Sequence, residues 1–120
     1  MKTARFLCLC LLLIPVPASG QATTVMTFDR GNDFLAACEH PKDELTNYAC
    51  TYYVFGVADG IDFTSGREKP VYCLDPHATM TQERSIVIRF MQAHPDRTHL
   101  ATAALISDAL RDAFPCHPAQ

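Results

Sequence analysis

Apolar residues recur at helical spacing along most of the chain, and no stretch shows the strict apolar–polar alternation of a half-buried strand. The stretches with helical spacing are residues 28–38, 42–60, 79–93 and 98–114. Short amphipathic helices bury their apolar faces by packing on one another. The pattern therefore predicts an all-α domain, a small bundle of about four helices.

The second stretch has an apolar stripe with aromatic residues at its flank. The stripe consists of Leu45, Ala49, Tyr52 and Gly56, and Tyr48 and Phe55 flank it. Gly56 and Gly60 are four residues apart, a spacing that more often allows two helices to pack closely than it forms a binding site. We therefore interpret the two glycines as a packing feature.

The helical pattern breaks over residues 61–72. Thr64-Ser65-Gly66 is a turn signal, and Pro70 blocks a helix. The sequence therefore predicts a loop of about twelve residues here, which is long for a compact domain. Loops of this length are often functional or mobile.

The third and fourth helical stretches meet at a His94-Pro95-Asp96 corner. Thr79 and Gln82 have the spacing of a capping box, which marks the start of the third helix. Its apolar face should consist of Ile86, Val87, Phe90 and Met91, while Glu83, Arg84 and Arg89 point elsewhere. The tight corner predicts that the third and fourth helices run antiparallel.

The first 20 residues have the layout of a secretory signal peptide. Lys2 and Arg5 give a positive start, and Ala18-Ser19-Gly20 offers small residues for cleavage. The apolar run between them, residues 6–14, is too short to span a bilayer. We expect residues 21–120 to form a single exported helical domain that has no contact with the membrane.

Charge narrows the choice of partners. The whole chain carries a formal charge of −3, and loss of Lys2 and Arg5 with the leader makes the charge about −5. A negative surface disfavours nucleic acid and anionic lipid as partners, and it is compatible with a basic protein.

Two of the six cysteines lie in the leader, which leaves four in the expected domain. In an oxidising compartment an even number of cysteines indicates disulfides, and four cysteines allow three pairings. Antiparallel third and fourth helices would bring Cys73 near Cys116, and Cys38 and Cys50 would close a short loop. We therefore predict two disulfides, Cys38–Cys50 and Cys73–Cys116, worth about 3 and 4 kcal/mol by loop-closure entropy.

Metal binding and catalysis have weaker support. Cys73 and His77, with Cys116-His117, do not match a strong zinc pattern. No Ser-His-Asp arrangement, phosphate loop or glycine-rich nucleotide motif is present, and Asp59 and Asp62 are best interpreted as residues at a helix end. We expect no metal site, no cofactor and no catalytic residue, so the chain is not expected to be an enzyme.

A set of short motifs in both halves of the chain resembles one family. In chain order they are Phe34-Leu35, Cys38, Cys50, Tyr53, Gly56-Val57, Asp59, Cys73-Leu74-Asp75-Pro76, His94-Pro95 and Ala113-Phe114-Pro115-Cys116. Together they resemble the Rap/Tai family of periplasmic immunity proteins, from about residue 34 to residue 116. Tyr52 stands where that family usually has glycine, a departure that bears on local packing or on the partner surface.

The resemblance implies a periplasmic protein that binds and inhibits a peptidoglycan amidase effector of type VI secretion by occluding its active site. It also implies that a homodimer is possible. The alternative is a small periplasmic binding or chaperone-like helical protein without enzymatic activity. A third class, an unrecognised hydrolase, is disfavoured because no catalytic set is present.

The expected loop after the second helix is the candidate for the contact with the effector. The partner-binding residues predicted there are Asp62, Phe63, Thr64, Ser65, Arg67, Glu68 and Lys69. The loop is charged and is held at one end by Cys73, so it could enter a cleft with little ordering cost. Phe63 would be its apolar anchor. The other interpretation is a solvated connector.

Overall fold

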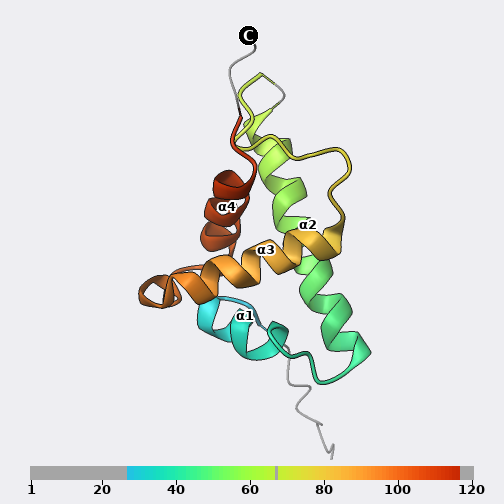
Figure 1. Ribbon diagram of the computed structural model, residues 1–120, viewed down its shortest axis with the longest axis vertical. Coiled ribbons are helices and arrows are strands. Elements are labelled where there is room, and N and C mark those ends of the chain that lie inside the picture. Colours follow the sequence, from blue (N-terminus) through green and yellow to red (C-terminus); the bar gives the residue numbers. More distant parts are fainter. Residues whose placement is uncertain (1–26, 67, 117–120) are drawn as a thin grey trace, which may run out of the picture.

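The computed structural model describes residues 27–66 and 68–116, and this part of the chain is built from helices alone (Figure 1). The helices are α1 (Gly31–Cys38), α2 (Glu44–Ser65), α3 (Met80–Ala93), the short 3₁₀ helix η1 (Pro95–Arg97) and α4 (Thr102–Ala113). The predicted all-α domain of about four helices is confirmed. The predicted leader, residues 1–20, lies outside the described residues.

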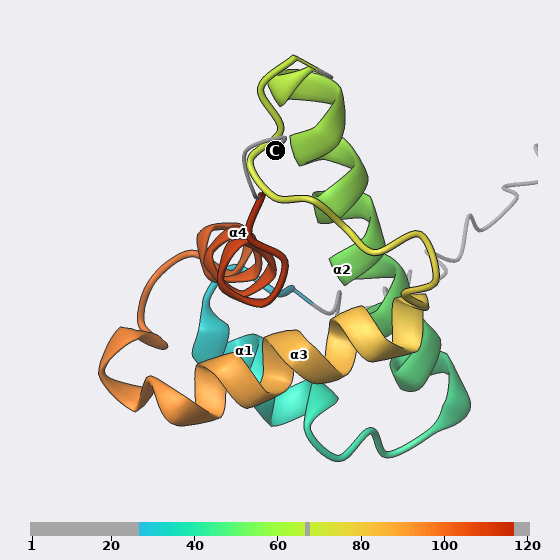
Figure 2. The same cartoon turned by 45° about the horizontal axis from the view of Figure 1, so that its top comes forward.

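Helix α3 lies at the centre and packs against the other three α-helices. In two views it crosses both α2 and α4 steeply (Figures 1 and 2). The prediction that α3 and α4 run antiparallel is therefore wrong. The domain is an arrangement of crossed helices, with α1 packed against α3 and lying below it in the view of Figure 1.

The connection between α3 and α4 explains the crossing. It is longer than a tight corner, because η1 is followed by four further residues before α4 begins. Its carbonyl groups accept hydrogen bonds from α1: Gly31 donates to Leu100 at 3.1 Å and Asn32 to Thr98 at 2.9 Å. A Cβ on Gly31 would lie 2.5 Å from a methyl group of Leu105 and 3.0 Å from the backbone oxygen of Thr98, so a larger residue would require the side chain of Leu105 and the connection to shift.

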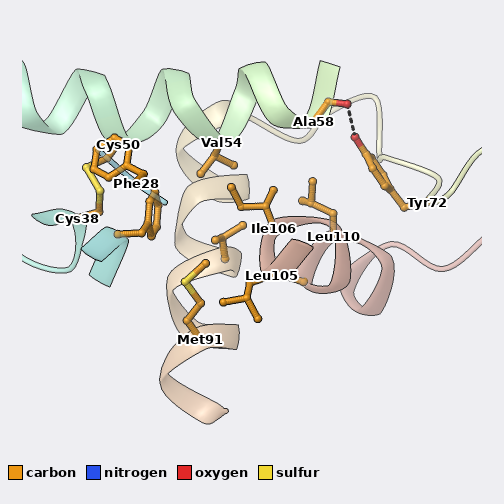
Figure 3. Packing of buried hydrophobic residues seen from close by; sticks show 13 residues of the cluster. Phe28, Cys38, Cys50, Val54, Ala58, Tyr72, Met91, Leu105, Ile106 and Leu110 are labelled. Atoms are coloured by element: carbon orange, nitrogen blue, oxygen red, sulfur yellow. Dashed lines mark hydrogen bonds between the residues drawn. A yellow bond between two sulfur atoms is a disulfide. The ribbon is translucent and has the colours of Figure 1, made fainter. Parts of the chain in front are cut away.

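The core fills the space where the four α-helices meet (Figure 3). Its largest fully buried apolar side chains are Phe34, Val54, Val87, Met91, Leu105, Ile106 and Leu110. Phe28, Phe34 and Tyr53 form an aromatic cluster, with ring centroids 5.5 Å apart for Phe28–Phe34 and 4.9 Å for Phe28–Tyr53. Every α-helix thus contributes apolar side chains to a single core.

The helix starts follow from local side-chain chemistry. The Asp43 carboxylate caps α2 by accepting the backbone N–H of Thr46 at 2.6 Å, and this bond is the main reason that the pKa of Asp43 is lowered. The predicted capping box of α3 is confirmed: Gln82 N–H donates to Thr79 Oγ1 at 3.3 Å, and Thr79 N–H donates to Gln82 Oε1 at 2.8 Å.

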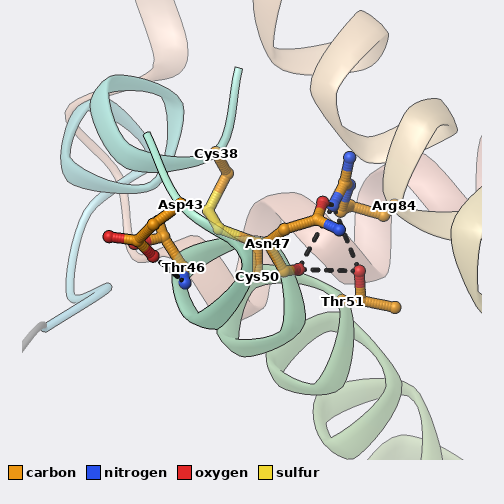
Figure 4. Close-up of a disulfide and its surroundings, with 7 residues drawn as sticks. All are labelled: Cys38, Asp43, Thr46, Asn47, Cys50, Thr51 and Arg84. Carbon is orange, nitrogen blue, oxygen red and sulfur yellow. Dashed lines mark hydrogen bonds between the residues drawn. A yellow bond between two sulfur atoms is a disulfide. The ribbon is translucent and has the colours of Figure 1, made fainter. Parts of the chain in front are cut away.

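Both predicted disulfides, Cys38–Cys50 and Cys73–Cys116, are present. The first joins the end of α1 to α2 and is fully buried (Figure 4). The second forms for a different reason from the one expected. The extended segment before α3, not α3 itself, lies beside the end of α4, where Cys73 N–H donates to the Phe114 carbonyl at 2.8 Å.

Candidate partner-binding surface

The segment predicted as a partner-binding loop is mostly helical. Asp62, Phe63, Thr64 and Ser65 form the last turn of α2, so the predicted break at residue 61 is wrong. Glu68 and Lys69 lie in the exposed turn that follows, and Arg67 lies outside the described residues.

The helix continues to Ser65 because its last polar residues bond back to it. Thr64 Oγ1 donates to the Gly60 carbonyl at 2.9 Å, and Ser65 Oγ donates to the Ile61 carbonyl at 2.8 Å. Ile61 also packs against the core. The helix stops at Gly66, whose φ of 69° suits glycine.

We call residues 61–66 the tip, because this end of α2 projects beyond the crossed helices (Figure 2). Phe63 is 89% exposed there. The turn of α2 that precedes the tip is anchored by a hydrogen bond: the buried Tyr72 hydroxyl donates to the Ala58 carbonyl at 3.0 Å (Figure 3). Burial, with the nearby Asp62 carboxylate, raises the pKa of Tyr72, so the hydroxyl keeps its proton and remains a donor.

A second exposed apolar surface runs along the solvent side of α2, at positions that the sequence pattern predicts as an apolar stripe and its flanks. We call it the aromatic stripe: Leu45 (79% exposed), Tyr48 (50%), Tyr52 (57%) and Phe55 (43%). Within the described residues nothing lies within 4 Å of a Cβ built on Gly56 or Gly60, so no helix packs on them. The interpretation of these glycines as a packing feature is wrong for the domain itself.

The opposite side of α2 faces the core. Its buried residues are Thr46, Cys50, Val54 and Ala58. Helical periodicity could not decide between the two sides, because both carry apolar residues at the same spacing. The disulfide was the available signal, since a Cys38–Cys50 bond turns the side of α2 that carries Cys50 toward α1.

Arg84 fixes this orientation of α2 (Figure 4). Its guanidinium donates to the Asn47 carbonyl and to Thr51 Oγ1, each at 3.2 Å, and also to the Asn47 side chain. The aromatic stripe is therefore held facing solvent by contacts between α3 and α2.

The charge on α2 has one sign. Its 22 residues include Glu44, Asp59 and Asp62 and contain no lysine or arginine. All three carboxylates belong to exposed residues that lie near the aromatic stripe or the tip. The exposed side of α2 is thus apolar and aromatic with an acidic border.

A shallow groove at the start of α3 contains residues of types that occur in hydrolases. Ser85, His77 and Asp75 line it together with Arg89 and Phe114. The Ser85 hydroxyl donates to the Thr81 carbonyl at 2.9 Å, and the Asp75 carboxylate accepts the backbone N–H of His77 at 2.8 Å. These polar groups stabilise the helix and the turn, and neither of these two hydrogen bonds joins a nucleophile to a base.

Residues 27–66 and 68–116 contain no group of three or more His, Cys, Asp or Glu side chains placed to hold a metal ion. Among the helices in the same ranges, none has the length and apolar character needed to cross a membrane.

These features define a small, disulfide-stapled helical domain whose most distinctive surface is an exposed aromatic side of one helix, as in proteins that act by binding other proteins. The chain belongs to the family of Rap1a immunity proteins, which matches residues 30–116. This agrees with the family resemblance inferred from the motifs. No curated protein and no solved structure shows significant similarity to the chain.

Membership of this family indicates an immunity protein that acts against a secreted effector, and it implies that the chain binds that effector as a partner. Immunity proteins of this kind are generally not enzymes.

Proposed function

We propose that the protein inhibits a peptidoglycan amidase effector of type VI secretion in the periplasm, by occluding the active site of that enzyme. Family membership supports an effector as the partner. The layout of the first 20 residues and the two disulfides favour export to an oxidising compartment, where peptidoglycan is the exposed target.

The observation that carries the occlusion proposal is the exposure of Phe63 on a braced helix end. An apolar side chain that is 89% exposed has little to contribute to its own core. The tip is helical and anchored by the Tyr72–Ala58 hydrogen bond, so inserting it into a cleft requires little ordering. Phe63 is the anchor, and Glu68 and Lys69 are polar contacts at the edge of the cleft.

The test uses the oxidised domain and periplasmic amidases, beginning with any encoded beside its gene. We expect tight binding and loss of peptidoglycan cleavage. Phe63→Ala should weaken binding by a factor of about 30, the size of an interface hot spot of roughly 2 kcal/mol. Leu100→Ala is the matched control, because Leu100 is an exposed apolar residue far from the tip in the sequence.

Equal inhibition by the parent and by Phe63→Ala would remove the tip from the mechanism. Failure of the parent to bind any amidase would contradict the proposed function, and the chaperone-like alternative would then take its place. A homodimer stays a prediction from the family resemblance, and the mass of the oxidised protein in solution tests it.

A further inference from the structure

The proposed insertion of the tip involves only the end of α2. It does not explain why the aromatic stripe is exposed. Leu45, Tyr48, Tyr52 and Phe55 lie on successive turns of the first half of the helix, over about 15 Å at 1.5 Å per residue. Removing these side chains from water would lower the free energy. The core of the domain does not do so, because α2 packs on it with the opposite side.

The stripe is ordered before any partner arrives. The Tyr48 hydroxyl donates to Glu44 Oε1 at 3.0 Å, and the Tyr48 and Tyr52 ring centroids are 6.4 Å apart. Rigid aromatic side chains supply contact area at a small entropic cost, and they are enriched at protein interfaces. Beyond the rings, Gly56 and Gly60 leave open space on the helix surface where side chains of a partner fit.

Charge selects the partner. A second copy of the chain would bring three more carboxylates of α2 toward Glu44, Asp59 and Asp62, with no lysine or arginine on either helix to pair with them. A partner with basic residues around an apolar groove would be attracted instead. Nucleic acid and anionic lipid are excluded because the side that would face them is acidic.

We infer that the aromatic stripe docks into an apolar groove bordered by lysine or arginine on the effector, outside the catalytic cleft. This rests on the proposed function in taking an effector as the partner. The inference adds a second contact, besides the tip, in which a helix lies in a groove of the partner. The stripe adds affinity without blocking the catalytic cleft, whereas the tip both anchors the effector through Phe63 and stops the held effector from cleaving.

The double variant Tyr48→Ala/Tyr52→Ala tests this division. Both side chains are exposed and alanine favours a helix, so the fold should persist, as circular dichroism and thermal unfolding would verify. We expect its Kd for the effector to rise at least about tenfold, while residual cleavage at saturating immunity protein equals that of the parent. Phe63→Ala should raise that residual cleavage, and Leu100→Ala should change neither quantity.

A charge variant tests the basic border. Glu44→Gln/Asp59→Asn should slow association with the effector, and the difference from the parent should shrink at high salt. If the variant and the parent associate with the effector at equal rates at low salt, the inference that the groove is bordered by lysine or arginine is wrong.

Other outcomes separate the two proposals. If the parent binds the effector and Tyr48→Ala/Tyr52→Ala binds it equally well, the stripe inference is wrong and the proposed function stands. If the parent is a dimer, the double variant is a monomer and effector affinity is unchanged, the stripe belongs to a second copy and the inference is overturned. If the parent binds no effector, both proposals fail.

Discussion

Glu83 is the most unusually placed titratable side chain in the described part of the domain. It lies in the first turn of α3 and is 3% exposed, and its Oε2 atom is buried without a hydrogen-bond partner. Burial, reinforced by the nearby Asp62 carboxylate, raises the pKa of Glu83. Its charged form therefore destabilises the fold at neutral pH.

Glu83→Gln should stabilise the protein at pH 7 by about 1 kcal/mol, because it removes an unpaired buried charge. The folded pKa is raised, so the contribution of Glu83 to stability is complete below its unfolded pKa and is lost as pH rises through the folded value. The advantage of the variant should therefore fade as pH falls toward 4. Urea unfolding at both pH values measures it, with Asp96→Asn, an exposed carboxylate, as the control. An advantage independent of pH would contradict this account.

Sequence patterns predict local hydrogen bonds in this domain better than they predict which side chains are buried. The capping box of Thr79 and Gln82 was predictable because its bonds lie within one helix turn. The burial of Glu83 was not predictable, because its position looks suited to solvent on α3 alone. The start of α3 crosses α2 (Figure 1), and the Asp62 carboxylate of α2 helps to raise the pKa of Glu83, so the surroundings of this side chain include a helix distant in sequence.

At the scale of elements, the orientation of α2 depends on α3. Arg84 bonds to the first half of α2 at Asn47 and Thr51. Without Arg84 the Asn47 carbonyl would keep the Thr51 hydroxyl as a donor at 3.0 Å, whereas the Asn47 side chain would lose its partner in a partly buried site. The contact therefore decides which of two apolar sides of α2 reaches solvent.

Arg84→Met should lower the free energy of unfolding by about 1–2 kcal/mol, since methionine keeps the apolar stem but removes the donor to the Asn47 side chain and to the Thr51 hydroxyl. Arg89→Met, at an exposed position of the same helix, should change stability little. Denaturant midpoints of the two variants give the comparison. An equal loss of stability in the two variants would show that removing one positive charge from α3, and not breaking the contact with α2, causes the effect.

Helix existence was predictable and helix extent was not. The stretch 42–60 indicated α2, but bonds from Thr64 and Ser65 and the packing of Ile61 carry the helix to Ser65. The tip residues were predicted as a contact on a loop. Asp62, Phe63, Thr64 and Ser65 lie instead on the last turn of a helix.

At the scale of the whole molecule, the crossing of α3 and α4 depends on contacts far apart in sequence. Hydrogen bonds from α1 hold the connection between α3 and α4, and Gly31 admits Leu105 at close range. A short-range pattern contains none of this information. The cysteine pairing was nevertheless correct, because closing a disulfide requires only that the two chain segments meet.

The two disulfides should stabilise different parts of the domain. Cys38→Ser/Cys50→Ser opens a loop with a sequence separation of 12, and Cys73→Ser/Cys116→Ser opens one of 43, with expected losses of about 3 and 4 kcal/mol. The buried pair joins α1 to α2 near the start of the aromatic stripe, whereas the second pair anchors the segment that carries Tyr72 beneath the tip.

Loss of Cys73–Cys116 should therefore speed amide exchange in residues 61–66 more than loss of Cys38–Cys50 does, although both variants are less stable. Hydrogen exchange under conditions where each variant remains folded measures this difference. Global unfolding alone would raise exchange throughout the domain in proportion to lost stability. Equal exchange at the tip in the two variants, after allowance for their stabilities, would show that the second disulfide does not brace it.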